Sequence, residues 1–94
     1  MNPGEIYDAS MALYYKGNFG EAIQGFLTII RSAPASKLVS YSQYMIGICY
    51  LKMEKYEEAI QQLERYLRDY PQSDREKEAE RGVQIANGRL NKKT

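Results

Sequence analysis

Histidine is absent from this sequence, and cysteine occurs once, at position 49. Without histidine the chain cannot carry a Ser-His or Cys-His nucleophile pair, an imidazole general base or a histidine metal ligand. A single cysteine cannot form an internal disulfide or a thiolate cage around a metal. Cys49 lies in the apolar run 45–51, so we expect it in the core rather than as a reactive thiol. We therefore expect no cofactor, no metal site and no enzymatic activity.

Charge of one sign is also missing, because 13 basic residues nearly balance 12 acidic ones and leave a net charge of +1. Nucleic acid and anionic membranes are held by one-signed surface fields, so such partners are disfavoured. No stretch approaches the ~20 apolar residues of a membrane span, and the first five residues lack the layout of a signal peptide. We expect a soluble chain without direct membrane insertion. A signal peptide removed from a longer parent would leave no trace here.

The length of 94 residues suits one small domain. At this size a chain buries only about 60% of the surface that its unfolded form exposes, which leaves little room for a deep substrate cavity. We therefore expect the function on a surface or in a shallow groove.

The sequence repeats itself with a period of 37 residues. Between the first two units this shift superposes eight identical pairs, among them the whole segment 21–24 on 58–61, and Tyr7 on Tyr44. A period in this range predicts a solenoid in which one supersecondary unit is used twice. The 20 residues that remain after two periods suffice for one more helix.

Each unit is expected to form two helices, because apolar residues recur at three- and four-residue steps. Pro34 and Pro71 close the second helix of each unit, and Gly17 ends the first helix of the chain with a left-handed residue. Asn18 before the second helix, and Ser73 with Glu76 before the fifth, have the spacing of helix caps. The expected helices cover about residues 3–16, 19–33, 37–53, 56–70 and 74–90.

The third and fifth helices differ in polarity. Residues 44–51 leave almost no polar side, so the third helix must be covered all round and should lie centrally. The fifth carries a narrow apolar stripe and is expected to act as a solvating cap. The predicted fold is all-α, an α-α superhelix of two helical hairpins and a C-terminal capping helix. Its repeats cover about 3–36 and 37–73 and its cap about 74–90, in one domain spanning 1–94.

The second unit carries the residues of a known repeat motif. They are Gln43, Ile46, Gly47, Tyr50, Ala59, Leu63, Tyr66 and Pro71. Their spacing resembles that of the tetratricopeptide repeat, in which two antiparallel helices approach closely at small residues such as Gly47 and Ala59. The first unit matches less well, and tryptophan is absent from both. The resemblance covers about residues 3–90.

A longer period than the usual repeat narrows the resemblance. Residues 37–39 extend the third helix by about one turn at its start. With the endings of both units, this extension is similar to bacterial envelope repeat proteins, such as the Tol-Pal-associated cell-division coordinator and the lipoprotein component of outer-membrane protein assembly. The resemblance favours the periplasm or cell envelope, and the cytoplasm is the alternative.

The resemblance implies that the first helix of each repeat lines a concave groove. The groove positions carried over to this sequence are Tyr7, Met11, Tyr14, Tyr41, Tyr44, Ile48 and Leu51, with Glu78, Arg81 and Ile85 from the fifth helix. Within each helix these spacings fall on one face. The aligned positions lack the basic and amide side chains with which other members clamp acidic chaperone tails. An apolar or aromatic segment is therefore the expected ligand.

An alternative is that the nine tyrosines pack a core that has no tryptophan and only two phenylalanines. We expect this packing role for the tyrosines at helix-contact positions, which are Tyr50, Tyr56, Tyr66 and Tyr70. The site hypothesis depends on those whose side of the first and third helices is uncovered, which are Tyr7, Tyr14, Tyr41 and Tyr44.

These patterns predict a non-enzymatic protein-interaction scaffold that binds a peptide segment or a partner helix in a tyrosine-rich groove. The alternative is a self-assembling module that forms homo-oligomers through the same groove or through the solenoid ends. The carboxylates of Glu57, Glu58 and Glu64 point outward, and we expect them to be solvated rather than catalytic.

Overall fold

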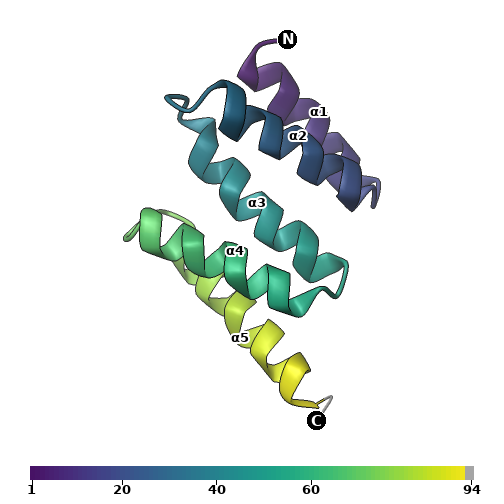
Figure 1. The fold of residues 1–94 in the computed structure, drawn as a ribbon, viewed down its shortest axis with the longest axis vertical. Coiled ribbons are helices and arrows are strands. Elements are labelled where there is room, and N and C mark those ends of the chain that lie inside the picture. The colour runs from purple at the N-terminus through teal and green to yellow at the C-terminus, as the bar shows by residue number, and fades with distance from the viewer. Residues whose placement is uncertain (93–94) are drawn as a thin grey trace.

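The computed structural model describes residues 1–92 and consists of five α-helices joined by short turns (Figure 1). The helices are α1 (Pro3–Tyr15), α2 (Phe19–Ser32), α3 (Leu38–Lys52), α4 (Tyr56–Asp69) and α5 (Glu76–Lys92). Each helix packs against the next one along the chain, from α1 at the top of Figure 1 to α5 at the bottom. This arrangement confirms the predicted all-α superhelix of helical hairpins. Residues 93–94 of the predicted domain lie outside the described residues.

The helix ends agree with the predicted ends to within two residues. The helices α2 and α4 end two residues before Pro34 and Pro71, because the residue before a proline is disfavoured in helical geometry. Gly17 directly follows the C-cap of α1 and has a φ of 83°, the left-handed conformation expected at the end of this helix. The start of α1 is fixed by a capping box, in which Asn2 and Glu5 each accept a hydrogen bond from the backbone N–H of the other.

One of the two predicted helix caps stands at its predicted position, but neither shows the expected side-chain hydrogen bond to its own helix. Asn18 occupies the cap position of α2, but its side chain makes no cap hydrogen bond. The hydroxyl of Ser73 accepts a hydrogen bond from the Tyr66 hydroxyl at 2.7 Å, so it serves the preceding helix instead of capping α5. The Glu76 carboxylate accepts from the backbone N–H of Gln72 at 2.6 Å. Because of these contacts α5 begins at residue 76, two residues later than expected.

The central helix is α3, as its apolar sequence predicted. It contacts all four other helices and lies between the two helix pairs in Figure 1. Its buried residues are Ser42, Gln43, Tyr44, Met45, Ile46, Gly47 and Cys49. The shortest dimension of the molecule is 18 Å, which two layers of helices about 10 Å in diameter fill completely. This thickness leaves little room for a deep internal cavity.

Close approach between helices depends on glycine at three points. A Cβ atom at Gly47 would lie 2.6 Å from one methyl carbon of Leu63, and a Cβ atom at Gly82 would lie 2.7 Å from the other. The fully buried Leu63 of α4 is thus held between the backbones of α3 and α5. In the first hairpin the side chain of Ser10 occupies the space above Gly25 in the same way. The expected close approach at Gly47 is confirmed.

The last helix, α5, packs against α4 through a narrow strip of small residues, and most of its other side chains are exposed. Its buried residues are Ala79, Gly82 and Ala86. This division confirms that α5 closes the core on one side and faces solvent on the other. Within residues 1–92, no helix combines the length and the apolar character needed to cross a membrane.

Candidate partner-binding trough

The helices α1, α3 and α5 form the inner side of the superhelix. Among the described residues, α1 touches α3 and α3 touches α5, whereas α2 and α4 do not touch each other. An array whose helices meet along one side and separate along the other curves toward the side where they meet. We call the inner surface the trough and define it by the predicted site residues Tyr7, Met11, Tyr14, Tyr41, Tyr44, Ile48, Leu51 and Arg81.

The 37-residue period arranges the trough positions in three ranks that cross the helices. The ranks are Tyr7 with Tyr44 and Arg81, Met11 with Ile48 and Ile85, and Tyr14 with Leu51 and Gly88. Equivalent positions on neighbouring repeats face the same way, because each unit repeats the geometry of the previous one. The middle rank is therefore apolar, and on α1 it lies between Tyr7 and Tyr14. Ile85, at the α5 end of this rank, is 45% exposed.

On α1, two tyrosines are held by edge-to-face aromatic contacts. The ring centroid of Tyr7 lies 5.6 Å from that of Phe26, at an interplanar angle of 63°. The Tyr14 ring lies 5.6 Å from Phe19 and 5.3 Å from Tyr15. Both trough tyrosines are half-buried, and such contacts favour fixed ring orientations. Both rings are therefore held in place on this side of α1.

The two tyrosines on α3 have different environments. Tyr44 is only 8% exposed and its ring centroid lies 5.5 Å from that of Tyr66, so it belongs to the floor of the trough. Tyr41 is half-buried, and its hydroxyl donates a hydrogen bond to the Asp74 carboxylate at 3.3 Å. Tyr41 is therefore the more accessible of the two and faces the start of α5.

The aliphatic trough residues Met11, Ile48 and Leu51 are half-buried. Met11 and Ile48 pack directly against the core cluster, and Leu51 reaches toward Gly82 of α5. These side chains close the trough from below and keep part of their apolar surface at its inner face.

The predicted site residue Arg81 is exposed on α5. With Lys77 and Glu78 it lines a shallow hollow of about 290 Å³. The negative charge of Glu78 adds to the burial that raises the pKa of Tyr44, which places this part of α5 beside the floor of the trough.

Arg75 is a trough residue that the sequence pattern did not indicate. Its guanidinium carbon lies 4.9 Å from the ring centroid of Tyr41 and 5.4 Å from that of Tyr44, within cation–π range. Burial raises the pKa of Tyr7 and of Tyr44 above the usual 10.0, and the charge of Arg75 opposes this rise at both. The positive charge of Arg75 therefore lowers the pKa of one tyrosine on α1 and one on α3. Arg75 lies in the turn directly before α5, three residues ahead of the groove position Glu78, and its contact with the tyrosine rings depends on how this turn folds back onto α3.

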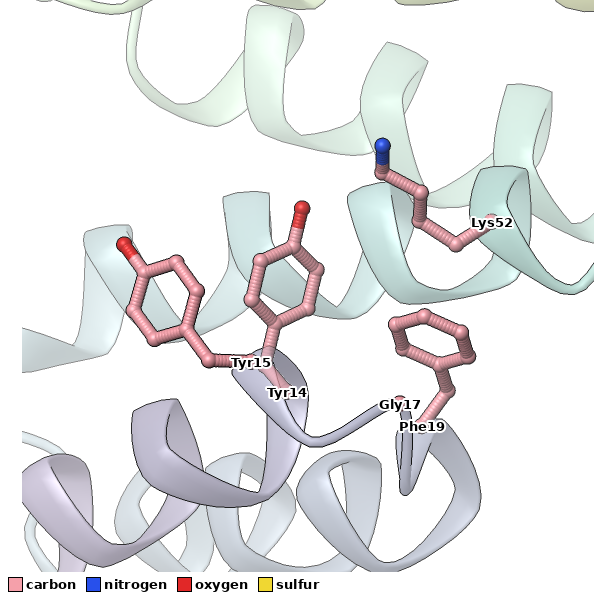
Figure 2. A pocket seen from close by; sticks show the side chains of 5 residues that line it. All are labelled: Tyr14, Tyr15, Gly17, Phe19 and Lys52. Atoms are coloured by element: carbon pink, nitrogen blue, oxygen red, sulfur yellow. The ribbon is translucent and has the colours of Figure 1, made fainter.

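A hollow at the opposite end of the trough was also missed. It measures about 340 Å³ and is lined by Tyr14, Tyr15, Gly17, Phe19 and Lys52. Figure 2 shows the Phe19 ring lying beside the aliphatic stem of Lys52, with the hydroxyls of Tyr14 and Tyr15 pointing to the same side. Tyr15 is 77% exposed. The hollow thus combines aromatic walls with an ammonium group at its rim.

The four tyrosines expected at helix contacts do pack there. Tyr56 and Tyr66 are buried, whereas Tyr50 and Tyr70 are half-buried against the core. The rings of Tyr66 and Tyr70 lie 5.5 Å apart. This packing role is confirmed.

Groups with catalytic potential lie outside the trough. Cys49 is completely buried, and burial raises the pKa of its thiol from 9.0 to about 12, so the reactive thiolate does not form near neutral pH. The outward carboxylates Glu57, Glu58 and Glu64 are exposed on α4, as expected. Within residues 1–92, no cluster of three cysteines or carboxylates could hold a metal ion. The trough itself offers apolar area, tyrosine hydroxyls and cations, which suit binding.

Comparison with known proteins bears on the family. Residues 1–81 match the family model described as YfiO, outer membrane lipoprotein. This match covers most of the chain and supports the resemblance to tetratricopeptide-like envelope proteins. The narrower likeness to the Tol-Pal-associated cell-division coordinator stays a prediction. No curated protein matches the chain significantly.

Proposed function

Because the chain belongs to the YfiO family of outer membrane lipoproteins, we propose that it is a non-enzymatic protein-interaction module of the cell envelope. Its ligand is an extended peptide segment or a partner helix that lies in the trough. Tetratricopeptide-like folds suit this task, since parallel inner helices present repeated surfaces to one ligand.

The observation that carries the proposal is the middle rank of apolar side chains, Met11, Ile48 and Ile85. These residues come from three helices, and Ile85 keeps 45% of its surface exposed. The half-buried rings of Tyr7 and Tyr14 border this rank on α1. Fixed aromatic rings beside apolar surface are typical anchors of protein interfaces, because they add contact area at a low cost in side-chain entropy.

The test introduces a charge into the exposed end of this rank. A displayed library of short linear peptides, selected on the folded chain, supplies ligands. We expect Ile85→Asp to weaken their binding by about tenfold or more, because a carboxylate must then be desolvated against apolar ligand groups. Fluorescence anisotropy with the selected peptides measures the dissociation constants.

The matched control is Gln61→Asp, which adds the same charge at an exposed position of α4 outside the trough. Its peptide binding should equal that of the unchanged chain. Both variants must retain the helical circular dichroism and the unfolding midpoint of the parent. Equal affinity of a folded Ile85→Asp variant would show that the ligand does not lie in the trough.

Self-association is the second candidate, favoured by the exposed apolar side chains of Tyr15 and Ile85. A second copy would then cover the trough. Static light scattering over a wide range of concentrations distinguishes this candidate, since a constant monomer mass excludes it. An oligomer that Ile85→Asp dissociates supports it.

A further inference from the structure

The guanidinium of Arg75 lies over two tyrosine rings of α3 and forms no ion pair within residues 1–92. Its guanidinium packs on Tyr41 at 4.9 Å and on Tyr44 at 5.4 Å. Its Nε atom is buried without a hydrogen-bond partner among the described residues. A buried N–H group without an acceptor costs free energy, so the guanidinium is not fully satisfied by the protein itself.

Nearby carboxylates do not fill this role. The Asp74 carboxylate accepts its hydrogen bond from the Tyr41 hydroxyl. The ion pairs seen within residues 1–92 join Arg65 and Arg68 to Asp69, through exposed side chains in the last turns of α4, and do not include Arg75. Glu78 stands one turn further along α5 and forms no ion pair with Arg75 there. The cation of the trough is therefore open to an external anion.

We infer that Arg75 is the anion anchor of the trough and takes the side-chain carboxylate of an Asp or Glu residue in an extended partner segment. A guanidinium presents its N–H donors as a planar fork that matches a carboxylate. The contacts with two tyrosine rings hold the guanidinium near the trough before a ligand arrives. The inference rests on the proposed function and names the chemistry of the partner.

The dimensions of α3 set the spacing of a second anchor. Tyr41, beneath Arg75, and Lys52, at the rim of the aromatic hollow, lie at opposite ends of this helix. A rise of 1.5 Å per residue puts them about 16 Å apart. An extended peptide covers this distance with about five residues. The partner should therefore carry an apolar or aromatic residue about five positions from its acidic one, seated in the hollow of Tyr14 and Phe19.

The probes are synthetic peptides blocked at both ends, so that a single glutamate supplies the only carboxylate. One peptide carries this glutamate and a phenylalanine about five positions apart. A second replaces the glutamate by glutamine, and a third places the two anchors side by side. Binding is followed by nuclear magnetic resonance through the side-chain Nε–Hε signal of Arg75. We expect the spaced glutamate peptide to bind about tenfold more tightly than either of the others.

Variants distinguish a carboxylate-binding role of Arg75 from a purely structural role in holding α5 against α3. Arg75→Gln should abolish the preference for glutamate over glutamine, whereas the control Arg68→Gln, at an exposed arginine of α4, should keep it. An arginine that only joins α5 to α3 would lower the unfolding midpoint on substitution. With such an arginine, the unsubstituted protein would bind the glutamate and glutamine peptides equally. The comparison of these two peptides therefore decides the question even if Arg75→Gln fails to fold.

The outcomes also separate this inference from the proposed function. Equal binding of the glutamate and glutamine peptides, no binding of either, or an Arg75 signal that does not shift overturns the anchor. If Ile85→Asp still weakens the library peptides, the trough stands without the anchor. If it does not, the trough itself is refuted. Equal binding of the spaced and adjacent peptides overturns the second anchor in the hollow.

Discussion

At the scale of single residues, Leu63 joins three helices. Its side chain is completely buried, and its two methyl carbons press on the backbone at Gly47 of α3 and Gly82 of α5. Burying a leucine contributes about 1.5–3 kcal/mol, whereas each helical glycine costs about 0.5–1 kcal/mol relative to alanine. The close fit offsets the low helix propensity of both glycines.

Substitution of Gly47 by alanine tests this fit. The added methyl would lie 2.6 Å from a Leu63 methyl carbon, so the Leu63 side chain or the two helices must shift. We expect the free energy of unfolding to fall by about 1–3 kcal/mol, as for other overpacked cores. Urea denaturation followed by circular dichroism measures the change.

The control is Gly88→Ala on α5, where nothing lies within 4 Å of the added atom. This variant should gain about 0.5–1 kcal/mol from helix propensity alone. If Gly47→Ala gains stability in the same way, the contact with Leu63 is not limiting.

At the scale of elements, the turn between α4 and α5 is organised by side chains of both flanks. The hydroxyl of Tyr66 donates to Ser73, and the carboxylate of Glu76 accepts from the backbone of Gln72, whose φ of 65° is left-handed. A left-handed non-glycine residue is disfavoured and persists only where its surroundings fix it. These contacts set where α5 begins, and hence where Arg75 meets the trough.

Ser73→Ala should lower the free energy of unfolding by about 1–3 kcal/mol, because the Tyr66 hydroxyl, in a residue only 1% exposed, loses its acceptor. In a Tyr66→Phe background the same substitution should cost much less, because no hydroxyl is left unpaired. A double-mutant cycle in urea measures this coupling. Additive losses would indicate that Ser73 instead acts as the cap that its spacing with Glu76 suggested.

The helices themselves were predictable from sequence, whereas the contacts of the turns were not. Pro34, Pro71 and the apolar periodicity act through local geometry, so they fix helix limits in any context. The spacing of Ser73 and Glu76 permits more than one set of hydrogen bonds, and the buried Tyr66 hydroxyl decides between them. That competitor lies seven residues away and becomes visible only in the folded chain.

The candidate site divides in the same way. The trough tyrosines were predictable because Tyr7 and Tyr14, and likewise Tyr41 and Tyr44, share a helical face. Whether a ring is accessible was not predictable, since burial of Tyr44 depends on the approach of α4. Arg75 and the aromatic hollow escaped prediction because both depend on how separate segments come together in the folded chain.

At the scale of the whole molecule, contacts are concentrated in the centre of a linear array. The helix α3 touches all four others, whereas α1 touches only α2 and α3 within the described residues. In such arrays each unit depends on its neighbours, so terminal helices open more readily than central ones.

Amide hydrogen exchange should therefore be slowest in α3 and faster in α1 and in the C-terminal half of α5. Mass spectrometry of peptic fragments under native conditions measures this order. Equal protection of all five helices would contradict it and indicate that exchange requires complete unfolding.

The contact of Leu63 with two glycines also limits how this sequence can diverge. A larger residue at position 47 or 82 is compatible with the fold only if position 63 becomes smaller. Substitutions at these three positions, one on each of three helices, therefore depend on one another. The trough residues of α1 lie on the other hairpin and escape this constraint. Selection can therefore change what the trough binds on that side without first rebuilding the core.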